Sequence, residues 1–168
     1  MVLTKRKHIM GFRLASVLLF LLLATLVSSA AAQEPSTGRT AETALPTVVV
    51  TKSPTCGCCG KWIEHLRAAG FPVEVHDTHA LHAFKERLGV PPSKRSCHTA
   101  EVAGYVVEGH VPAGDVKRLL AERPEARGLV LPGMPMGSPG MEMPDGRVMP
   151  YTVELLGNDG STRAFAEH

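Results

Sequence analysis

The sequence predicts a mixed α/β fold, and three observations lead to that prediction. Strand-like and helix-like patterns alternate between residues 47 and 88, which is typical of a βαβ unit with a parallel pair of strands. A further strand-like region at 101–111 precedes a third helix pattern at 112–123. Three of the four cysteines stand between the first predicted strand and the first predicted helix. The expected order is therefore βαβ, a ββ hairpin and a helix, with the cysteines at the end of the first strand.

The first half of the domain supplies the βαβ unit and a second helix. The β-branched run at 47–51 predicts a buried strand. The helix pattern that begins near Lys61 ends at Gly70, where glycine favours a helix stop. Alternating residues at 72–77 predict the second strand, and 81–88 predict the second helix. Large apolar side chains at helical spacing are expected in the core: Trp62, Leu66, Leu81, Phe84 and, from the third helix, Leu119.

The second half combines a hairpin, a helix and an irregular region. A strand at 101–107 is expected to turn at Glu108 and Gly109 into a short partner strand. Residues 127–150 contain so many prolines and glycines that they predict a loop, and five of the seven methionines lie there. Two strand patterns within 151–165 then close the chain as a hairpin.

The N-terminal 32 residues predict a signal peptide. Four basic residues precede an apolar run at 14–27, and small residues follow at 28–32, so cleavage is expected after Ala32 or Ala30. The run of 14 residues is shorter than the roughly 18 apolar residues that a membrane span needs. A retained N-terminal anchor is the alternative.

Export would change the charge balance of the chain. The signal peptide holds 4 of the 18 Lys and Arg and none of the 16 Asp and Glu, so the remaining chain has 14 − 16 = −2. Domains that bind nucleic acid usually carry a clustered positive excess, which this balance lacks. Polar, small and proline-bearing residues at 33–46 predict a flexible linker, and 47–168 predict one domain.

The predicted order of elements is that of thioredoxin-like proteins, in which the loop before the third strand lies beside the start of the first helix. Cys97 stands in that loop, so we expect it to lie near the cysteine motif at 56–59. Thioredoxins carry CxxC and a proline just before the third strand. This chain has CxCC, and Cys97-His98 stands near the place of that proline. Ordinary disulfide exchange is therefore less favoured.

The cysteine cluster predicts binding of a soft metal ion. A helix N-terminus favours the thiolate form of cysteine, and thiolates and thioethers select Cu(I). Adjacent Cys58 and Cys59 can bridge neighbouring ions, so several Cu(I) ions per chain are expected. Zinc is less favoured, because zinc sites usually pair two separated Cys-x₂₋₄-Cys elements. The predicted ligands are Cys56, Cys58, Cys59 and Cys97.

Histidine and methionine side chains are candidates for a secondary role at this site. His98 adjoins Cys97 and is suited either to bind the metal or to stabilise a thiolate. Methionines on a loop have no core-packing role there, although they could cover an apolar groove. The candidates for secondary metal binding are His98, Met134, Met136, Met141 and Met143.

Longer motifs carry a resemblance to a known family. They are CGCC at 56–59 followed by Trp62, GVP at 89–91, SCHTA at 96–100, GYVVEGHVP at 104–112, PGMP at 132–135 and GSPGME at 137–142. Together they resemble the exported bacterial metal-binding family known as domain-of-unknown-function 411, which includes the CopG-like periplasmic copper-resistance proteins. The resemblance covers roughly residues 47–156. It implies a thioredoxin-like fold, copper binding through the cysteines and a place in periplasmic copper handling.

We therefore predict a periplasmic protein that binds copper as Cu(I) and acts in copper resistance by sequestration, transfer or redox conversion. Its expected partners are copper ions and other periplasmic copper-handling proteins, with no nucleic acid, and with membrane contact only through an uncleaved signal peptide. One alternative is a thiol–disulfide oxidoreductase of thioredoxin-like fold. Another is a secreted domain with purely structural disulfides, although clustered cysteines close only short loops and stabilise little.

Overall fold

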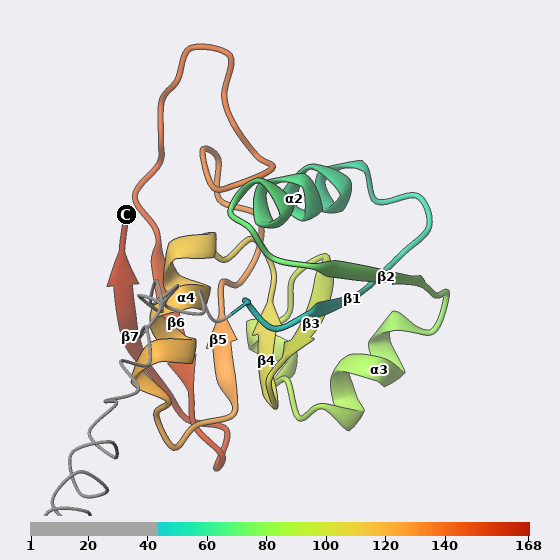
Figure 1. The fold of residues 1–168 in the computed structure, drawn as a ribbon, viewed down its shortest axis with the longest axis vertical. Coiled ribbons are helices and arrows are strands. Elements are labelled where there is room, and N and C mark those ends of the chain that lie inside the picture. The colour runs from blue at the N-terminus through green and yellow to red at the C-terminus, as the bar shows by residue number, and fades with distance from the viewer. Residues whose placement is uncertain (1–43) are drawn as a thin grey trace, which may run out of the picture. The chain divides into compact units, whose positions relative to one another are not determined.

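A computed structural model describes residues 44–168 as a seven-stranded mixed sheet with three α-helices (Figure 1). The predicted signal peptide and most of the predicted linker lie outside the described residues. Within 44–168, none of the helices has the length and apolar character needed to cross a membrane. The strands are β1 (Val48–Lys52), β2 (Val73–Asp77), β3 (His98–Val102), β4 (Tyr105–Glu108), β5 (Gly128–Val130), β6 (Thr152–Leu156) and β7 (Thr162–Glu167), and the helices are α2 (Gly57–Ala68), α3 (Leu81–Arg87) and α4 (Ala113–Glu122), with a 3₁₀ turn η1 at Pro92–Lys94.

The sheet has the strand order β2-β1-β3-β4-β5-β6-β7. β1 and β2 are parallel, as expected for the predicted βαβ unit, and β3 runs antiparallel to both β1 and β4. β5 lies parallel to β4 and antiparallel to β6, which joins the C-terminal hairpin of β6 and β7 to the same sheet. The predicted mixed α/β class is confirmed, and its sheet is larger than the predicted βαβ, hairpin and helix would make alone.

The two faces of the sheet are covered differently. α2 and α4 pack their apolar side chains on one face, where Trp62, Leu66 and Leu119 are fully buried. Successive residues of a strand point to opposite faces, so the neighbours of core residue Ala100 point away from this core. One of those neighbours, Thr99, contacts Lys85 of α3. α3 therefore lies over the opposite face.

Three elements differ from the predictions: the start of α2, the position of the hairpin turn, and a strand within the predicted loop. α2 begins at Gly57 rather than near Lys61, so the cysteine motif is part of its first turn. The hairpin turns at Ala103 and Gly104, which both have positive φ as two-residue hairpin turns require, and not at Glu108. The predicted loop contains β5, which is buried throughout. Strands buried on both faces lose the alternation that marks a strand in sequence, which explains both strand errors.

The core prediction is wrong for the second helix. Leu81 and Phe84 of α3 are only partly buried and lie outside the main apolar cluster. The buried residue of α3 is instead Lys85, which is 4 % exposed. A short helix can be held to a sheet by one buried ion pair, and sequence periodicity does not reveal this kind of anchor.

Truncating Leu66 is expected to destabilise the domain strongly. Its side chain is fully buried in the core between α2 and the sheet, so Leu66→Ala should lower the free energy of unfolding by about 2–5 kcal/mol through lost burial and the cavity it leaves. Denaturant unfolding measures this loss. Leu81→Ala is the matched control, because the same truncation at a partly buried site should cost less. Equal losses at both positions would contradict the described packing of α2.

Candidate metal centre

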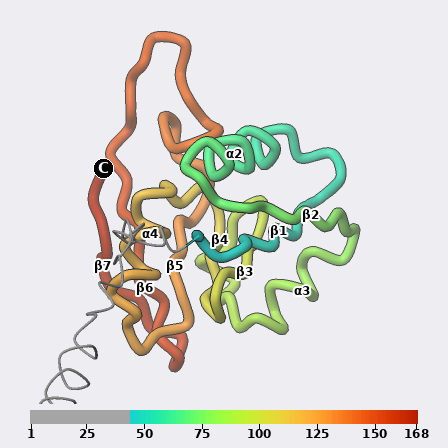
Figure 2. Tube along the Cα trace, in the orientation of Figure 1, coloured from blue at the N-terminus to red at the C-terminus, as the bar shows by residue number. Residues whose placement is uncertain are grey.

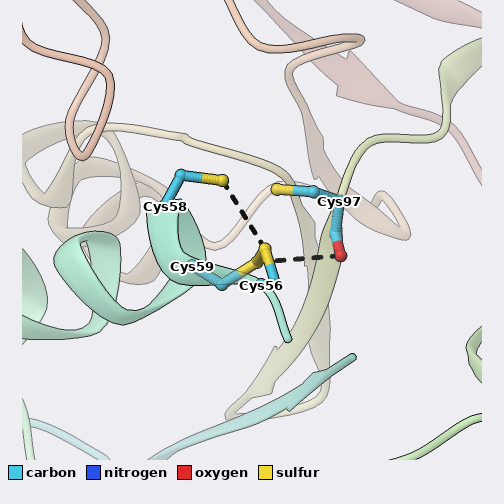
Figure 3. Close-up of side chains that lie close together, drawn as sticks. All are labelled: Cys56, Cys58, Cys59 and Cys97. Carbon is cyan, nitrogen blue, oxygen red and sulfur yellow. Dashed lines mark hydrogen bonds between the residues drawn. A yellow bond between two sulfur atoms is a disulfide. The ribbon is translucent and has the colours of Figure 1, made fainter. Parts of the chain in front are cut away.

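The N-terminal turn of α2 presents three of the cysteines. β1 ends two residues after Val50, and the chain then turns so that Cys56 is the N-cap residue of α2. Cys58 and Cys59 follow in the first helical turn. Cys97, just before β3, completes a group whose four sulfur atoms all lie within 4.8 Å of one another (Figure 3). Two segments far apart in sequence thus meet in one cluster of sulfur atoms.

The four cysteines are not equivalent in this structure. Cys56 and Cys59 form a disulfide, whereas Cys58 and Cys97 are free thiols. Figure 3 shows the sulfur atoms of Cys58 and Cys97 pointing toward each other beside that disulfide. The sulfur of Cys58 lies 3.5 Å from that of Cys56, and the sulfur of Cys59 lies 3.8 Å from the carbonyl oxygen of Cys97. The structure therefore describes the oxidised form of a site that can hold four thiols.

Two buried histidines extend the cluster on the side of Cys97. The sulfur of Cys97 lies 3.3 Å from Nδ1 of His98 and 3.0 Å from Nε2 of His110. These three ligand atoms form a second group within 4.8 Å, and both imidazoles are fully buried. His98 also packs against Trp62, with ring centroids 4.3 Å apart. Cys97 is thus shared between a group of four sulfurs and a group of one sulfur and two imidazoles.

The hydrogen bond of His110 to a backbone carbonyl determines which of its ring nitrogens carries the proton. Nδ1 lies 2.7 Å from the carbonyl oxygen of Pro139. Because a carbonyl can only accept, Nδ1 carries the proton and Nε2 presents its lone pair to Cys97. In His98, the buried Nε2 has no hydrogen-bond partner among the described residues. His110 therefore offers a nitrogen lone pair to a site otherwise made of sulfur, and His98 places its Nδ1 beside the same sulfur atom.

Burial favours the neutral forms of Cys97, His98 and His110. Burial raises the pKa of the Cys97 thiol to about 12, and the nearby Cys58 adds to the rise. Burial lowers the pKa of His98 well below its usual value, helped by His110 and Lys85, and burial also lowers the pKa of His110. A neutral imidazole can bind a metal ion, whereas a thiol must first lose its proton. A soft metal ion would therefore displace a proton from Cys97.

The lowered histidine pKa values predict that the domain loses stability in mild acid. The unfolded chain takes up protons on His98 and His110 near pH 6.5, whereas the native state resists protonation because both rings are buried. The free energy of unfolding should be constant above about pH 7.5 and fall below about 6.5, by up to about 1.4 kcal/mol per pH unit for each histidine. Denaturant unfolding from pH 8 to about 5.5 measures this. A flat profile over that range would contradict the burial of these rings.

The methionine-bearing loop between β5 and β6 lies against α2 (Figures 1 and 2). Gly140 makes the closest approach: its φ is +87°, and a Cβ there would lie 2.8 Å from the carbonyl oxygen of Cys58 and 2.9 Å from the amide nitrogen of Trp62. On the same loop, the sulfur of Met134 lies 3.8 Å from that of Cys58. The loop thus forms one wall of the site, and Met134 is its half-exposed member nearest a cysteine.

The other methionines are placed less closely. Met136 is 39 % exposed, Met141 and Met143 are partly buried, and the contacts among the described residues do not join these three sulfurs to a cysteine. His110 was not among the predicted site residues, although it lies within the GYVVEGHVP motif at 104–112. Only that motif could have pointed to His110, because a single histidine after a strand is not by itself a sign of a functional site. That the cysteines, His98 and the methionines bind metal stays a prediction.

Comparisons with known proteins identify the family of this chain. The sequence model of a family described as "Protein of unknown function, DUF411" matches residues 94–141, which include Cys97, His98 and His110. Two solved structures titled copper resistance protein CopG, forms 1 and 2, are 47% and 46% identical to this chain. Each match covers 74% of this chain and 98% of the other, with a TM-score of 0.70. No curated protein matched the chain. The chain belongs to the CopG-like copper-resistance family that contains the DUF411 domain.

Proposed function

We propose that this chain binds Cu(I) through Cys56, Cys58, Cys59 and Cys97 and that it does so in copper resistance. The observation that carries the proposal is the approach of all four sulfur atoms to within 4.8 Å of one another. Thiolates are soft ligands that select Cu(I) over hard cations. The similar structures are titled copper resistance proteins, which favours copper over zinc as the ion.

Full occupation of the site requires reduction of the Cys56–Cys59 disulfide. A dithiol reductant would supply two electrons and two protons, which break the S–S bond and leave two thiols while the reductant becomes a disulfide. Cu(I) then replaces the thiol protons. Because Cys58 and Cys59 are adjacent on one helical turn, their sulfurs are better suited to bridge neighbouring ions than to share one tetrahedral ion. We therefore expect more than one Cu(I) per chain.

A competition titration tests this proposal. The reduced chain is titrated anaerobically with Cu(I) in the presence of a coloured Cu(I) chelator, and the copper-to-protein ratio is read from the chelator. The control is the same chain with its thiols blocked by iodoacetamide. We expect the reduced chain to withdraw copper from the chelator and the blocked chain to withdraw none. Equal behaviour of the two samples would refute cysteine ligation.

The methionine loop is proposed to deliver copper rather than to hold it. A thioether is neutral and binds Cu(I) more weakly than a thiolate, which suits transient capture beside Cys58. Changing Met134, Met136, Met141 and Met143 together to Leu keeps the apolar bulk and removes the sulfur. Loading from a weak donor should slow, while the final copper content changes little. If the rate of copper loading does not change, the methionines only cover an apolar groove. If the final copper content falls by whole ions, the methionines are ligands of the site.

We also propose that the protein acts in the periplasm and exchanges copper with other copper-handling proteins there. The signal-peptide pattern at 1–32 and its small residues before Gln33 support export. N-terminal sequencing of the protein from a periplasmic extract tests this, with a new N-terminus near Gln33 as the expected result. An intact N-terminus in the membrane fraction would indicate a retained anchor instead.

A second candidate is thiol–disulfide exchange, and the Cys56–Cys59 disulfide favours it. The free thiol of Cys58 lies 3.5 Å from the sulfur of Cys56, so attack there would release Cys59 and form a strained link between near neighbours. Reduction of a model protein disulfide by the reduced, copper-free chain measures this activity. Under the copper proposal we expect slow turnover that Cu(I) abolishes. Fast turnover with no Cu(I) binding would favour the oxidoreductase.

A further inference from the structure

The face of the sheet opposite the main core carries a buried cluster of charged and polar side chains. Lys85 of α3, Thr99 of β3 and Glu108 of β4 are 4 %, 0 % and 0 % exposed. Thr99 and Glu108 are direct partners in the β3–β4 register, so their side chains stand side by side on that face. Neither Lys85 nor Glu108 belongs to the sulfur cluster, and nothing in the copper proposal above uses them.

Every member of this cluster is joined to the others. The Nζ of Lys85 donates to Oε1 of Glu108 at 2.6 Å and to the hydroxyl of Thr99 at 2.8 Å. The Thr99 hydroxyl in turn donates to Oε2 of Glu108 at 2.6 Å. The geometry closes a triangle in which a buried carboxylate, a hydroxyl and an ammonium group satisfy one another.

Glu108 also reaches out of the triangle to the segment that bears Cys97. Its Oε1 accepts a hydrogen bond from the amide of Ser96 at 2.6 Å. Ser96 is the residue directly before Cys97, and its hydroxyl donates to the carbonyl oxygen of Gly133 on the methionine-bearing loop. The segment that bears Ser96 and Cys97 is thus held by the Glu108 carboxylate on one side and by the methionine-bearing loop on the other.

Stability alone is a poor explanation for this arrangement. Removing two charges from water costs about as much free energy as their attraction returns, and apolar residues of similar volume often serve equally well or better. α3 could be held to the sheet by apolar contacts, yet its buried residue is Lys85. What an apolar group cannot supply is a directional acceptor for the Ser96 amide. The cluster is therefore better explained by the position it imposes than by the stability it adds.

We propose that Lys85, Thr99 and Glu108 are positioning residues that hold the Cys97 segment at the distance from α2 that copper binding requires. This inference rests on the proposed Cu(I) function, in which Cys97 is a ligand. Glu108 holds the Ser96 amide, and Lys85 and Thr99 fix the carboxylate so that it cannot turn away. These hydrogen bonds thus couple α3, on the far face of the sheet, to the sulfur cluster.

The test replaces the polar triangle by apolar groups. The variant Lys85→Met/Thr99→Val/Glu108→Leu should fold, since such replacements of buried ion pairs are often tolerated. We expect its Cu(I) affinity to fall by at least about tenfold, as with other losses of groups that support metal ligands. The matched control is Lys94→Met/Glu154→Leu, which removes a nearby pair at 2.5 Å whose Glu154 does not contact Ser96. The control should keep the parent affinity.

Two additions make every outcome decisive. The variant Lys85→Met/Glu108→Gln removes both charges but keeps an acceptor for the Ser96 amide beside Thr99, so its affinity should lie between those of the parent and the triple variant. It also serves if the triple variant fails to fold. Alkylation of Cys97 in the reduced, copper-free chain, followed by mass spectrometry, should be faster in the triple variant than in the control. Parent-like affinity and alkylation in the triple variant would overturn the positioning role. A parent chain that binds no Cu(I) would overturn the proposed function instead, and the alkylation rates would still decide the positioning role.

Discussion

Cys97→Ser is expected to lower the Cu(I) affinity of the reduced chain by more than about a hundredfold. Loss of groups that merely support a ligand typically costs about 10–100-fold in metal affinity, so loss of a ligand should exceed that range. The effect should be large because Cys97 is the member of the sulfur group that comes from outside the N-terminal turn of α2 and its N-cap. Without it, the remaining thiols lie on one helical turn and cannot surround an ion. Competition with a Cu(I) chelator measures the loss.

Ser93→Ala is the matched control for Cys97→Ser. Ser93 lies in η1 on the same connection and is exposed, so its replacement should change neither folding nor copper binding. In denaturant unfolding, both variants should keep the parent's free energy of unfolding within about 0.5 kcal/mol, because neither leaves a large cavity. If Cys97→Ser bound Cu(I) as tightly as the control, the described meeting of β3 with α2 would not form the metal site.

Gly140→Val is expected to displace the methionine-bearing loop from α2. Its φ of +87° is costly for a β-branched residue, and the new Cβ would lie 2.8 Å from the Cys58 carbonyl oxygen and 3.2 Å from Nδ1 of His110. Strain of this kind costs on the order of 1–3 kcal/mol before the clash is counted. The loop should move away, separating Pro139 from His110 and Met134 from Cys58. Slower copper loading and a lower free energy of unfolding are the expected results.

Gly133→Ala separates backbone strain from the clash. Gly133 is on the same loop with φ +70°, but a Cβ there meets no atom within 4 Å. Its replacement should cost roughly 1 kcal/mol of strain and leave copper loading unchanged. If Gly140→Val loaded copper as fast as Gly133→Ala, the contact of the loop with α2 would have no part in loading.

The parts of the fold that could be predicted were those with a clear period or a strong stop. α4 and β2 follow their patterns, and α2 ends before Gly70 as predicted, although it begins four residues before Lys61. β5 could not be predicted, because its three buried residues, Gly128–Val130, carry no alternation. The role of Lys85 as the anchor of α3 was equally hidden, since its partners lie on strands that only the folded sheet brings together.

The candidate site was predictable in its cysteines and less so in its surroundings. The predicted order of strands and helices places Cys97 beside the cysteine motif at 56–59, and the four sulfur atoms do lie together. The contact of His110 with Cys97 depends on the path of the chain after β4. The sequence predicts a short partner strand there, whereas the hairpin turn lies at Ala103 and Gly104 and the chain leads from β4 to α4. The oxidation state of Cys56 and Cys59 has no sequence signature either, because the same spacing serves a disulfide or two thiolates.

X-ray absorption at the copper edge tests the copper proposal most directly. The reduced chain, loaded anaerobically with Cu(I), should show the edge of Cu(I), a first shell dominated by sulfur, and copper–copper scattering from bridging thiolates. Cys97→Ser should lose that copper–copper contribution. A first shell of nitrogen and oxygen alone would contradict the account, because it would place the copper away from Cys56, Cys58, Cys59 and Cys97.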